Sequence, residues 1–199
     1  MSIENIFLDR DGTIIQDMHY LKDPEKISLI PEAVQAMKEM SQQDRKIFIV
    51  TNQSGIGRKY FSNQDYFLIE KTLDKMLTDQ GIKIQDSIFC PHQPEEQCSC
   101  RKPQTGMWEQ LFAKHSLSSE YSIMVGDKKS DLDFGANCGF YASILVLTGK
   151  GRKTLAQLEI DENDSDWFEP QIEFPVSLIA AQNLLSAWQW IKKEAHDAF

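Results

Sequence analysis

The stretch Ile6-Phe7-Leu8-Asp9-Arg10-Asp11-Gly12-Thr13 decides the fold, because a short apolar run ends at two carboxylates separated by one residue. The apolar run favours a strand that is buried on both faces, and Gly12 permits a sharp turn out of the sheet. Asp9 and Asp11 would then lie at the carboxyl end of a parallel strand, where open α/β sheets bind their ligands. Taken alone, the octapeptide fits two interpretations: a turn at a strand end, or a pair of carboxylates that acts in catalysis.

After this first strand, strand-like and helix-like segments alternate along the chain. Apolar runs predict further strands at residues 46–50, 84–89, 121–125 and 142–147, and apolar periodicity predicts helices at 31–42, 63–78, 105–114 and 130–136. Pro31 is typical of a helix start, and Ser62 is a plausible N-cap. The alternation predicts an α/β fold, with a doubly wound, mainly parallel sheet sandwiched by helices. We expect one domain over residues 1–199, without a separate cap domain.

The last quarter of the chain gives weaker signals. Residues 153–166 are polar and acidic, so we expect a solvent-exposed segment there. Trp167-Phe168 is expected to form a short edge strand. Apolar positions recur at helical spacing from Val176 to Glu194, which predicts a terminal helix packed on the sheet.

Composition and charge limit the kinds of molecule that the chain is expected to bind. The formal net charge of -9 argues against general nucleic-acid binding, so an anionic substrate would need a local cluster of basic groups or a metal ion. The first residues contain neither a basic leader nor a long apolar segment, and we expect a cytoplasmic protein with no membrane contact. Few obvious apolar surface helices favour a monomer.

Four predicted strands or their loops end in polar residues. Asp9 and Asp11 follow the first strand, Thr51 the second, Arg101-Lys102 the loop after the third, and Asp127 the fourth. Parallel strands bring their carboxyl ends to one edge, which would combine carboxylates, a hydroxyl group and fixed cations. These groups suit the transfer of a phosphoryl group, whose negative charge must be neutralised while the attacking and leaving oxygens lie in line.

This set resembles the four motifs of the haloacid dehalogenase superfamily of phosphatases, which are matched here by Asp9-Arg10-Asp11-Gly12-Thr13, Thr51, Lys102 and Gly126-Asp127. More narrowly, the chain resembles the phosphatases of heptose bisphosphates within that superfamily. The segments that carry this likeness are Thr51-Asn52-Gln53-Ser54-Gly55, Cys90-Pro91-His92, Cys98-Ser99-Cys100-Arg101-Lys102-Pro103, Gly106-Met107 and Val125-Gly126-Asp127-Lys128.

The resemblance implies a reaction in which Asp9 attacks the 7-phosphate of the sugar and becomes an aspartyl-phosphate. Asp11 would protonate the departing sugar oxygen and then activate the hydrolytic water. The resemblance also implies Mg²⁺ held by the Asp9 carboxylate, the Asp11 main-chain carbonyl and Asp127, with Thr51 and Lys102 on the phosphoryl oxygens. The implied substrate contacts are Asp17, Met18, His19, Tyr20, Thr51, Asn52, Gln53, Ser54, Arg101, Lys102 and Lys128, with Arg58 and Lys59 as further candidates. The implied role is the synthesis of nucleotide-activated heptose for lipopolysaccharide or other surface glycans.

Cys90, His92, Cys98 and Cys100 supply three thiolates and an imidazole, enough for a closed tetrahedral Zn²⁺ site. The loop has little core of its own, so the metal would replace packing and act structurally. It would also hold Arg101-Lys102 at the sheet edge. The alternative is a loop of thiols without metal.

Three other functions compete with this interpretation. Histidinol-phosphate phosphatase would share the aspartate chemistry and a similar zinc loop, but its cationic substrate favours nearby carboxylates over additional Arg or Lys side chains. A phosphomutase would need its phosphoenzyme shielded from water, and no insertion is long enough for a shielding domain. A catalytically inactive, zinc-stabilised binding module would not need Asp9, Asp11, Lys102 and Asp127 all to be present.

Overall fold

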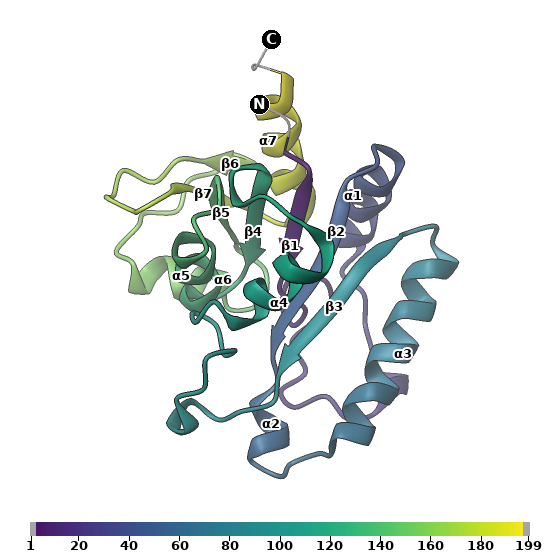
Figure 1. The fold of residues 1–199 in the computed structure, drawn as a ribbon. Coiled ribbons are helices and arrows are strands. Elements are labelled where there is room, and N and C mark those ends of the chain that lie inside the picture. Colours follow the sequence, from purple (N-terminus) through teal and green to yellow (C-terminus); the bar gives the residue numbers. More distant parts are fainter. Residues whose placement is uncertain (1–2, 197–199) are drawn as a thin grey trace.

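One seven-stranded sheet runs through residues 3–196, the part of the chain that the computed structural model describes (Figure 1). The strands lie in the spatial order β3-β2-β1-β4-β5-β7-β6, and all neighbouring pairs are parallel except β6 and β7. The strands are β1 (Asn5–Leu8), β2 (Lys46–Asn52), β3 (Ile84–Cys90), β4 (Ser122–Gly126), β5 (Ala142–Val146), β6 (Trp167–Phe168) and β7 (Ser177–Ala181). The predicted doubly wound, mainly parallel α/β sheet is confirmed, and no separate cap domain interrupts it within the described range.

Helices cover both faces of the sheet because side chains of its central strands alternate in direction. The helices are α1 (Pro31–Gln42), α2 (Ser54–Gly57), α3 (Asn63–Asp79), α4 (Gly106–His115), α5 (Lys129–Asn137), α6 (Gly151–Gln157) and α7 (Leu184–His196). Ile6 and Leu8 point toward the face packed by α1, α3 and α7. Phe7 points to the opposite face, where α4 and α5 pack, and α6 continues this layer over β5 and β7. The central strand β1 is therefore buried on both faces, as the sequence predicts.

Several predicted helix ends agree with the structure. The helix predicted at residues 31–42 is α1, which begins at Pro31. Ser62 caps α3: Ser62 Oγ accepts a hydrogen bond from the Asp65 backbone N–H at 3.2 Å, and the Ser62 backbone N–H donates to the Asp65 carboxylate at 2.7 Å. This reciprocal pair satisfies backbone donors that a helix start leaves free.

Of the predictions for the last quarter of the chain, one was confirmed in part and another was wrong. Residues 153–166 are mostly exposed, as expected, but α6 buries Thr154 and Leu155. The terminal helix expected from Val176 begins only at Leu184, because Ser177–Ala181 forms β7 against β5. Four consecutive buried residues, Leu178 to Ala181, fit a strand that is covered on both faces, and this burial outweighs the helical spacing that continues beyond them.

The register of the central strands brings the site residues together. Leu8 pairs with Ile49 of β2 and with Val125 of β4, so Asp9 leaves the sheet between the ends of these two strands. The Asp9 backbone N–H donates to the Val125 carbonyl at 2.9 Å, which extends the β1–β4 pairing by one residue. None of the helices within residues 3–196 is long and apolar enough to cross a membrane.

Candidate active site

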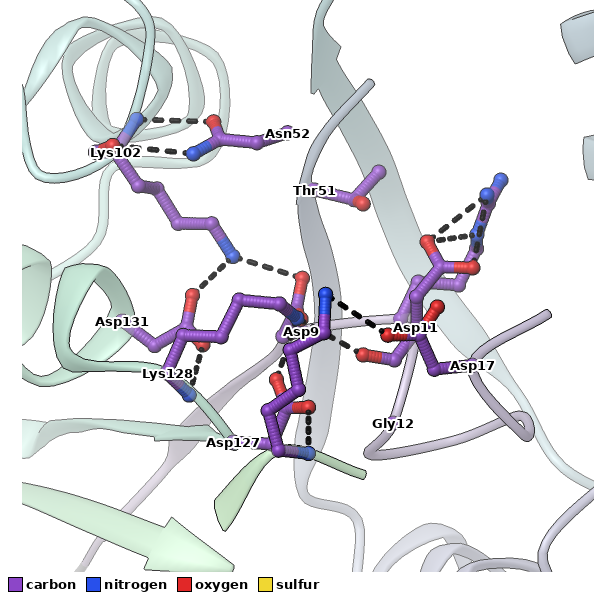
Figure 2. Close-up of polar contacts among 12 residues, drawn as sticks. Asp9, Asp11, Gly12, Asp17, Thr51, Asn52, Lys102, Asp127, Lys128 and Asp131 are labelled. Atoms are coloured by element: carbon purple, nitrogen blue, oxygen red, sulfur yellow. Dashed lines mark hydrogen bonds and ion pairs between the residues drawn. The ribbon is translucent and has the colours of Figure 1, made fainter. Parts of the chain in front are cut away.

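The carboxylate of Asp9 lies between two lysine ammonium groups at the carboxyl edge of the sheet (Figure 2). Lys102 Nζ donates to Asp9 Oδ1 at 2.9 Å, and Lys128 Nζ donates to Asp9 Oδ2 at 3.0 Å. Burial alone would raise the pKa of Asp9, but these two cations outweigh it and hold the pKa well below its ordinary value. Asp9 is therefore an ionised carboxylate in a buried position, the state that a nucleophile requires.

Lys102 is fixed by contacts at both its side chain and its backbone. Its ammonium also donates to the Val50 carbonyl at 2.6 Å and lies 2.6 Å from Asp131 Oδ1 of α5. Burial alone would lower the pKa of Lys102, but Asp131 and Asp9 raise it above its ordinary value, so the ammonium stays charged. The Asn52 amide donates to the Lys102 carbonyl and accepts from the Lys102 backbone N–H, both at 3.0 Å. The end of β2 thus determines where the loop after β3 places its lysine.

The ammonium of Lys128 lies among three oxygen atoms, and these belong to the groups that the resemblance implies as Mg²⁺ ligands. Besides Asp9 Oδ2, it contacts the Asp11 carbonyl at 3.1 Å and Asp127 Oδ1 at 2.5 Å. Burial and the charge of Asp9 raise the pKa of Asp127 to about 7, although Lys128 acts in the opposite direction. Carboxylate and carbonyl oxygens are the donors that Mg²⁺ prefers. The position is electrostatically suited to a cation, so the residues present fit the implied metal.

Asp11 is held on the other side by its neighbour Arg10 and by Gln53 of the loop after β2. The Arg10 guanidinium is buried and donates to both Asp11 carboxylate oxygens, at 3.1 and 3.3 Å. The Gln53 amide donates to Asp11 Oδ2 and to Thr51 Oγ1, at 2.8 Å in each case. Because Thr51 Oγ1 accepts this bond, its own proton is available to an incoming oxygen atom. One glutamine therefore orients both the carboxyl group and the hydroxyl group.

Two glycines allow two loops to approach each other closely beside Asp127. Gly12 has a φ of 92°, and a Cβ atom there would overlap Asp127 Oδ2. A Cβ atom at Gly149, in the loop after β5, would lie 2.6 Å from the Cα of Gly12. Thr148 Oγ1 donates to the Gly12 carbonyl at 2.6 Å, and the Lys150 backbone N–H donates to Asp127 Oδ2 at 2.8 Å. The loop after β5 thus packs against the turn at Gly12 and orients Asp127.

A cavity of about 250 Å³ opens above these groups. Its lining includes the predicted substrate contacts Asp17, His19, Tyr20, Thr51, Asn52, Gln53, Ser54, Arg101, Lys102 and Lys128. Met18 does not belong to the lining, and this residue is 46% exposed. Arg58 and Lys59 also lie outside the lining, and Arg58 instead forms an ion pair with Glu95 at 3.7 Å.

The sequence patterns did not identify Lys150 as a residue of the cavity wall, and they left the role of Asp131 open. Lys150 belongs to the loop that follows a predicted strand, so its place at the common edge was the signal that could have revealed it. Asp131 contacts the catalytic candidate Lys102 through its side chain, and it also accepts from the Lys128 backbone N–H at 3.0 Å. Neither interaction is visible in local sequence patterns.

The four predicted ligands, at the end of β3 and in the loop that follows it, come together as a second potential metal centre. Their ligand atoms all lie within 4.8 Å of one another, and the three cysteines are not in disulfides. Cys98 Sγ lies 3.5 Å from the sulfur atoms of both Cys90 and Cys100, and His92 Nδ1 lies 3.3 Å from Cys100 Sγ. Tetrahedral Zn–S bonds place two sulfurs about 3.8 Å apart. The cluster therefore has the donor set and nearly the spacing of a closed metal site.

Comparison with known proteins agrees with this geometry. Residues 99–167 match a family described as HAD-hydrolase-like. The D-glycero-beta-D-manno-heptose-1,7-bisphosphate 7-phosphatase of Haemophilus influenzae is 36% identical over 151 residues, which cover 73% of this chain and 82% of that protein. The corresponding alpha enzyme of Photorhabdus laumondii is 37% identical over 154 residues, which cover 74% of this chain and 84% of that protein.

A solved structure of a heptose bisphosphate phosphatase is also similar to this chain. The D,D-heptose 1,7-bisphosphate phosphatase of B. bronchiseptica, complexed with magnesium and phosphate, superposes with a TM-score of 0.82 at 30% identity. The alignment covers 96% of this chain and 99% of that one.

The strand-end aspartates, the threonine and the lysine on this sheet define the class, which is the haloacid dehalogenase superfamily of phosphatases. Within it, the chain belongs to the family of D-glycero-D-manno-heptose-1,7-bisphosphate 7-phosphatases.

Proposed function

We propose that this chain is a Mg²⁺-dependent phosphatase that removes the 7-phosphate of D-glycero-D-manno-heptose 1,7-bisphosphate. The observation that carries the proposal is the buried, ionised Asp9 at the floor of a cavity lined by Arg101, Lys102, Lys128 and Lys150. The Asp9 carboxylate, held in place by Lys102 and Lys128, can attack phosphorus, while these two cations neutralise the phosphoryl oxygens. Family membership supports the choice of sugar.

In the first step, an Asp9 oxygen forms a bond to phosphorus while the bond from phosphorus to the sugar oxygen breaks. The departing oxygen takes a proton from the Asp11 carboxyl group, leaving an aspartyl-phosphate and the sugar hydroxyl. Gln53 holds the Asp11 carboxyl group and the Thr51 hydroxyl group in fixed positions, so both can act on the same phosphoryl group. Lys102 donates to a phosphoryl oxygen from its fixed position between Asp9 and Asp131.

In the second step, the Asp11 carboxylate takes a proton from water, and the water oxygen attacks phosphorus. The acyl phosphate bond breaks, which returns the Asp9 carboxylate and releases inorganic phosphate. Asp9, the Asp11 carbonyl and Asp127 would hold Mg²⁺, with the Lys128 ammonium displaced from among these oxygens. When bound, the metal supplies positive charge that offsets the phosphoryl negative charge.

The cysteine and histidine cluster is proposed as a structural Zn²⁺ site. Cys100 comes two residues before Lys102, and the Arg101 guanidinium donates to the His92 carbonyl at 3.2 Å. A metal bound by Cys90, His92, Cys98 and Cys100 would therefore fix the loop that carries the two basic residues. The site is closed by four protein ligands, which suits a structural role.

The product of this reaction, a heptose 1-phosphate, suits a cytoplasmic route to nucleotide-activated heptose for lipopolysaccharide or other surface glycans. We place the chain in that compartment and expect it to act as a monomer. Size-exclusion chromatography with light scattering tests the oligomeric state.

The test measures phosphate release with Mg²⁺ from both anomers of the heptose bisphosphate and from histidinol phosphate, in parallel with Asp9→Asn. Both anomers are included because the alpha and beta relatives are equally similar to this chain. We expect preference for a bisphosphate and a loss of at least about 10³-fold in the variant, since the nucleophile is removed. Preference for histidinol phosphate would overturn the substrate assignment but keep the nucleophile. Full activity of Asp9→Asn would overturn the mechanism.

A further inference from the structure

Lys150, in the loop after β5, lines the cavity, but the proposed reaction gives this lysine no task. The Lys150 backbone is fixed by its hydrogen bond to Asp127, and Thr148 ties the same loop to the Gly12 carbonyl. The side chain of Lys150 starts beside the metal-binding carboxylate and reaches the loop before α1, where its ammonium lies 3.2 Å from Asp17 Oδ2. Lys150 thus connects the floor of the cavity to the predicted substrate loop.

Lys150 differs from the other two lysines of the cavity in how fully its charge is matched. Lys102 and Lys128 each contact three oxygen atoms, and both are held against the Asp9 carboxylate. Lys150, in contrast, contacts the single carboxylate of Asp17 among the described residues, and its side chain is 45% exposed. An ammonium with one partner can exchange that partner for a more highly charged one.

We propose that Lys150 binds the second phosphate of a bisphosphate substrate, the one that is not transferred, and gives up its ion pair with Asp17 when it does so. This inference rests on the proposed function, because it requires a substrate with two phosphates. A phosphate monoester carries more negative charge at pH 7 than one carboxylate and offers three acceptor oxygens, so it competes effectively with Asp17 for the ammonium.

The positions of the lysines in the cavity fit one lysine that binds the transferred phosphoryl group and another that binds the second phosphate. Lys102 and the Thr51 hydroxyl lie at the buried floor beside Asp9, where the transferred phosphoryl group must lie. Lys150 lies in the more exposed part of the wall, beside Asp17 of the substrate loop. The exchange also leaves the Asp17 carboxylate free to accept a hydrogen bond from a sugar hydroxyl. One ion pair would therefore supply both a phosphate donor and a hydroxyl acceptor.

The test compares Lys150→Gln with Lys153→Gln on heptose 1,7-bisphosphate and on heptose 7-phosphate, which lacks the second phosphate. Lys153 is an exposed lysine of α6 outside the cavity lining, so its variant makes the same charge change nearby. For Lys150→Gln we expect about a 10-fold higher KM for the bisphosphate, with kcat and the values for the monophosphate nearly unchanged. Lys150→Arg should restore most of the affinity, and Lys153→Gln should resemble the wild type.

The outcomes separate this inference from the proposed function. Equal losses on both substrates would overturn the inference, because Lys150 would then act by positioning the substrate loop. An unchanged KM for the bisphosphate would overturn it as well. If the wild-type chain released no phosphate from the bisphosphate, the proposed function would fail and this inference with it. Thermal unfolding of each variant verifies that the comparison is made on folded protein.

Discussion

The aspartate and lysine cluster and the cysteine and histidine cluster lie at the same edge of the sheet, but they are assembled differently. The first brings Asp9, Lys102 and Asp127 from distant parts of the chain, and they meet because β1 and β4 are paired and packed. The second takes all its ligands from residues 90–100, which are the last residue of the edge strand β3 and the loop that follows it. One site is therefore held by the core of the protein, whereas the other would depend on the Zn²⁺ ion that we propose it binds.

Removal of the Lys102 ammonium should have the largest effect on stability and activity, because it is the shared ion-pair partner of Asp9 and Asp131. We expect Lys102→Met to lower the free energy of unfolding by about 3–5 kcal/mol, since buried carboxylates lose their shared partner. Phosphate release should fall by at least about 10³-fold. Urea unfolding and steady-state assays measure the two quantities.

The control for this prediction is Lys114→Met, which makes the same substitution in an exposed ion pair with Asp86. An exposed pair contributes only about 0–1 kcal/mol, so this variant should stay near the wild type in both measurements. If the two variants lost the same stability, the idea that the core holds the strand-end cluster would be wrong.

Disruption of the cysteine and histidine cluster should produce a smaller and more local effect. We expect Cys100→Ser to lose bound zinc and to lower phosphate release by about 10- to 100-fold, because the loop no longer fixes Lys102. The far-ultraviolet circular dichroism should change little, since the sheet does not depend on this loop. Metal analysis, limited proteolysis and the phosphate assay test these expectations.

Cys138→Ser is the matched control, because Cys138 is a buried cysteine of the core outside the cluster. It should keep its zinc and resist cleavage within residues 90–101. Normal metal content in Cys100→Ser would contradict the assignment of that residue as a ligand.

The smallest predicted effect concerns the pH dependence of Mg²⁺ binding. Since burial raises the pKa of Asp127 to about 7, its carboxyl group is largely protonated at pH 6 in the metal-free protein. Mg²⁺ requires the ionised form, so its affinity should be about 10-fold lower at pH 6 than at pH 8, and binding at pH 6 should release a proton. Calorimetry in buffers of different ionisation enthalpy measures both.

The same pKa fixes the sign of the stability change without metal. A carboxyl group whose folded-state pKa is raised contributes stability below its unfolded pKa and loses it as the pH rises through about 7. The Asp127 contribution to the free energy of unfolding should therefore decrease from pH 4 to pH 7. In Asp127→Asn this contribution and the proton release should both be absent, and a proton release that persisted would point to another carboxyl group.

The sequence alone predicted the elements whose patterns are local. The apolar run before Asp9 and the proline at the start of α1 each determine their own structure. Residues 177–181 were assigned to a helix because their own sequence does not show that the edge of β5 is available to pair with them as β7. α6 was missed because it is short and buries few apolar side chains.

In the site, too, the positions of residues along the chain were predictable, whereas contacts between distant side chains were not. The placement of polar residues after predicted parallel strands was enough to bring Asp9, Asp11, Thr51, Lys102 and Asp127 to one edge of the sheet. It could not show whether a side chain faces the cavity or a neighbouring backbone, and the Asn52 amide turns to the Lys102 backbone while it borders the cavity. Lys150 remained unassigned for the related reason that its partner Asp17 is remote in sequence.

The close approach of Gly12 and Gly149 has a consequence for changing the substrate range of this protein. Side chains larger than hydrogen do not fit between the two loops, so positions 12 and 149 offer almost no freedom for variation. The cavity itself is lined instead by side chains, among them those of His19, Tyr20 and Arg101. Libraries aimed at new sugars should therefore leave both glycines intact and randomise these lining positions, where sequence can change without moving Asp127.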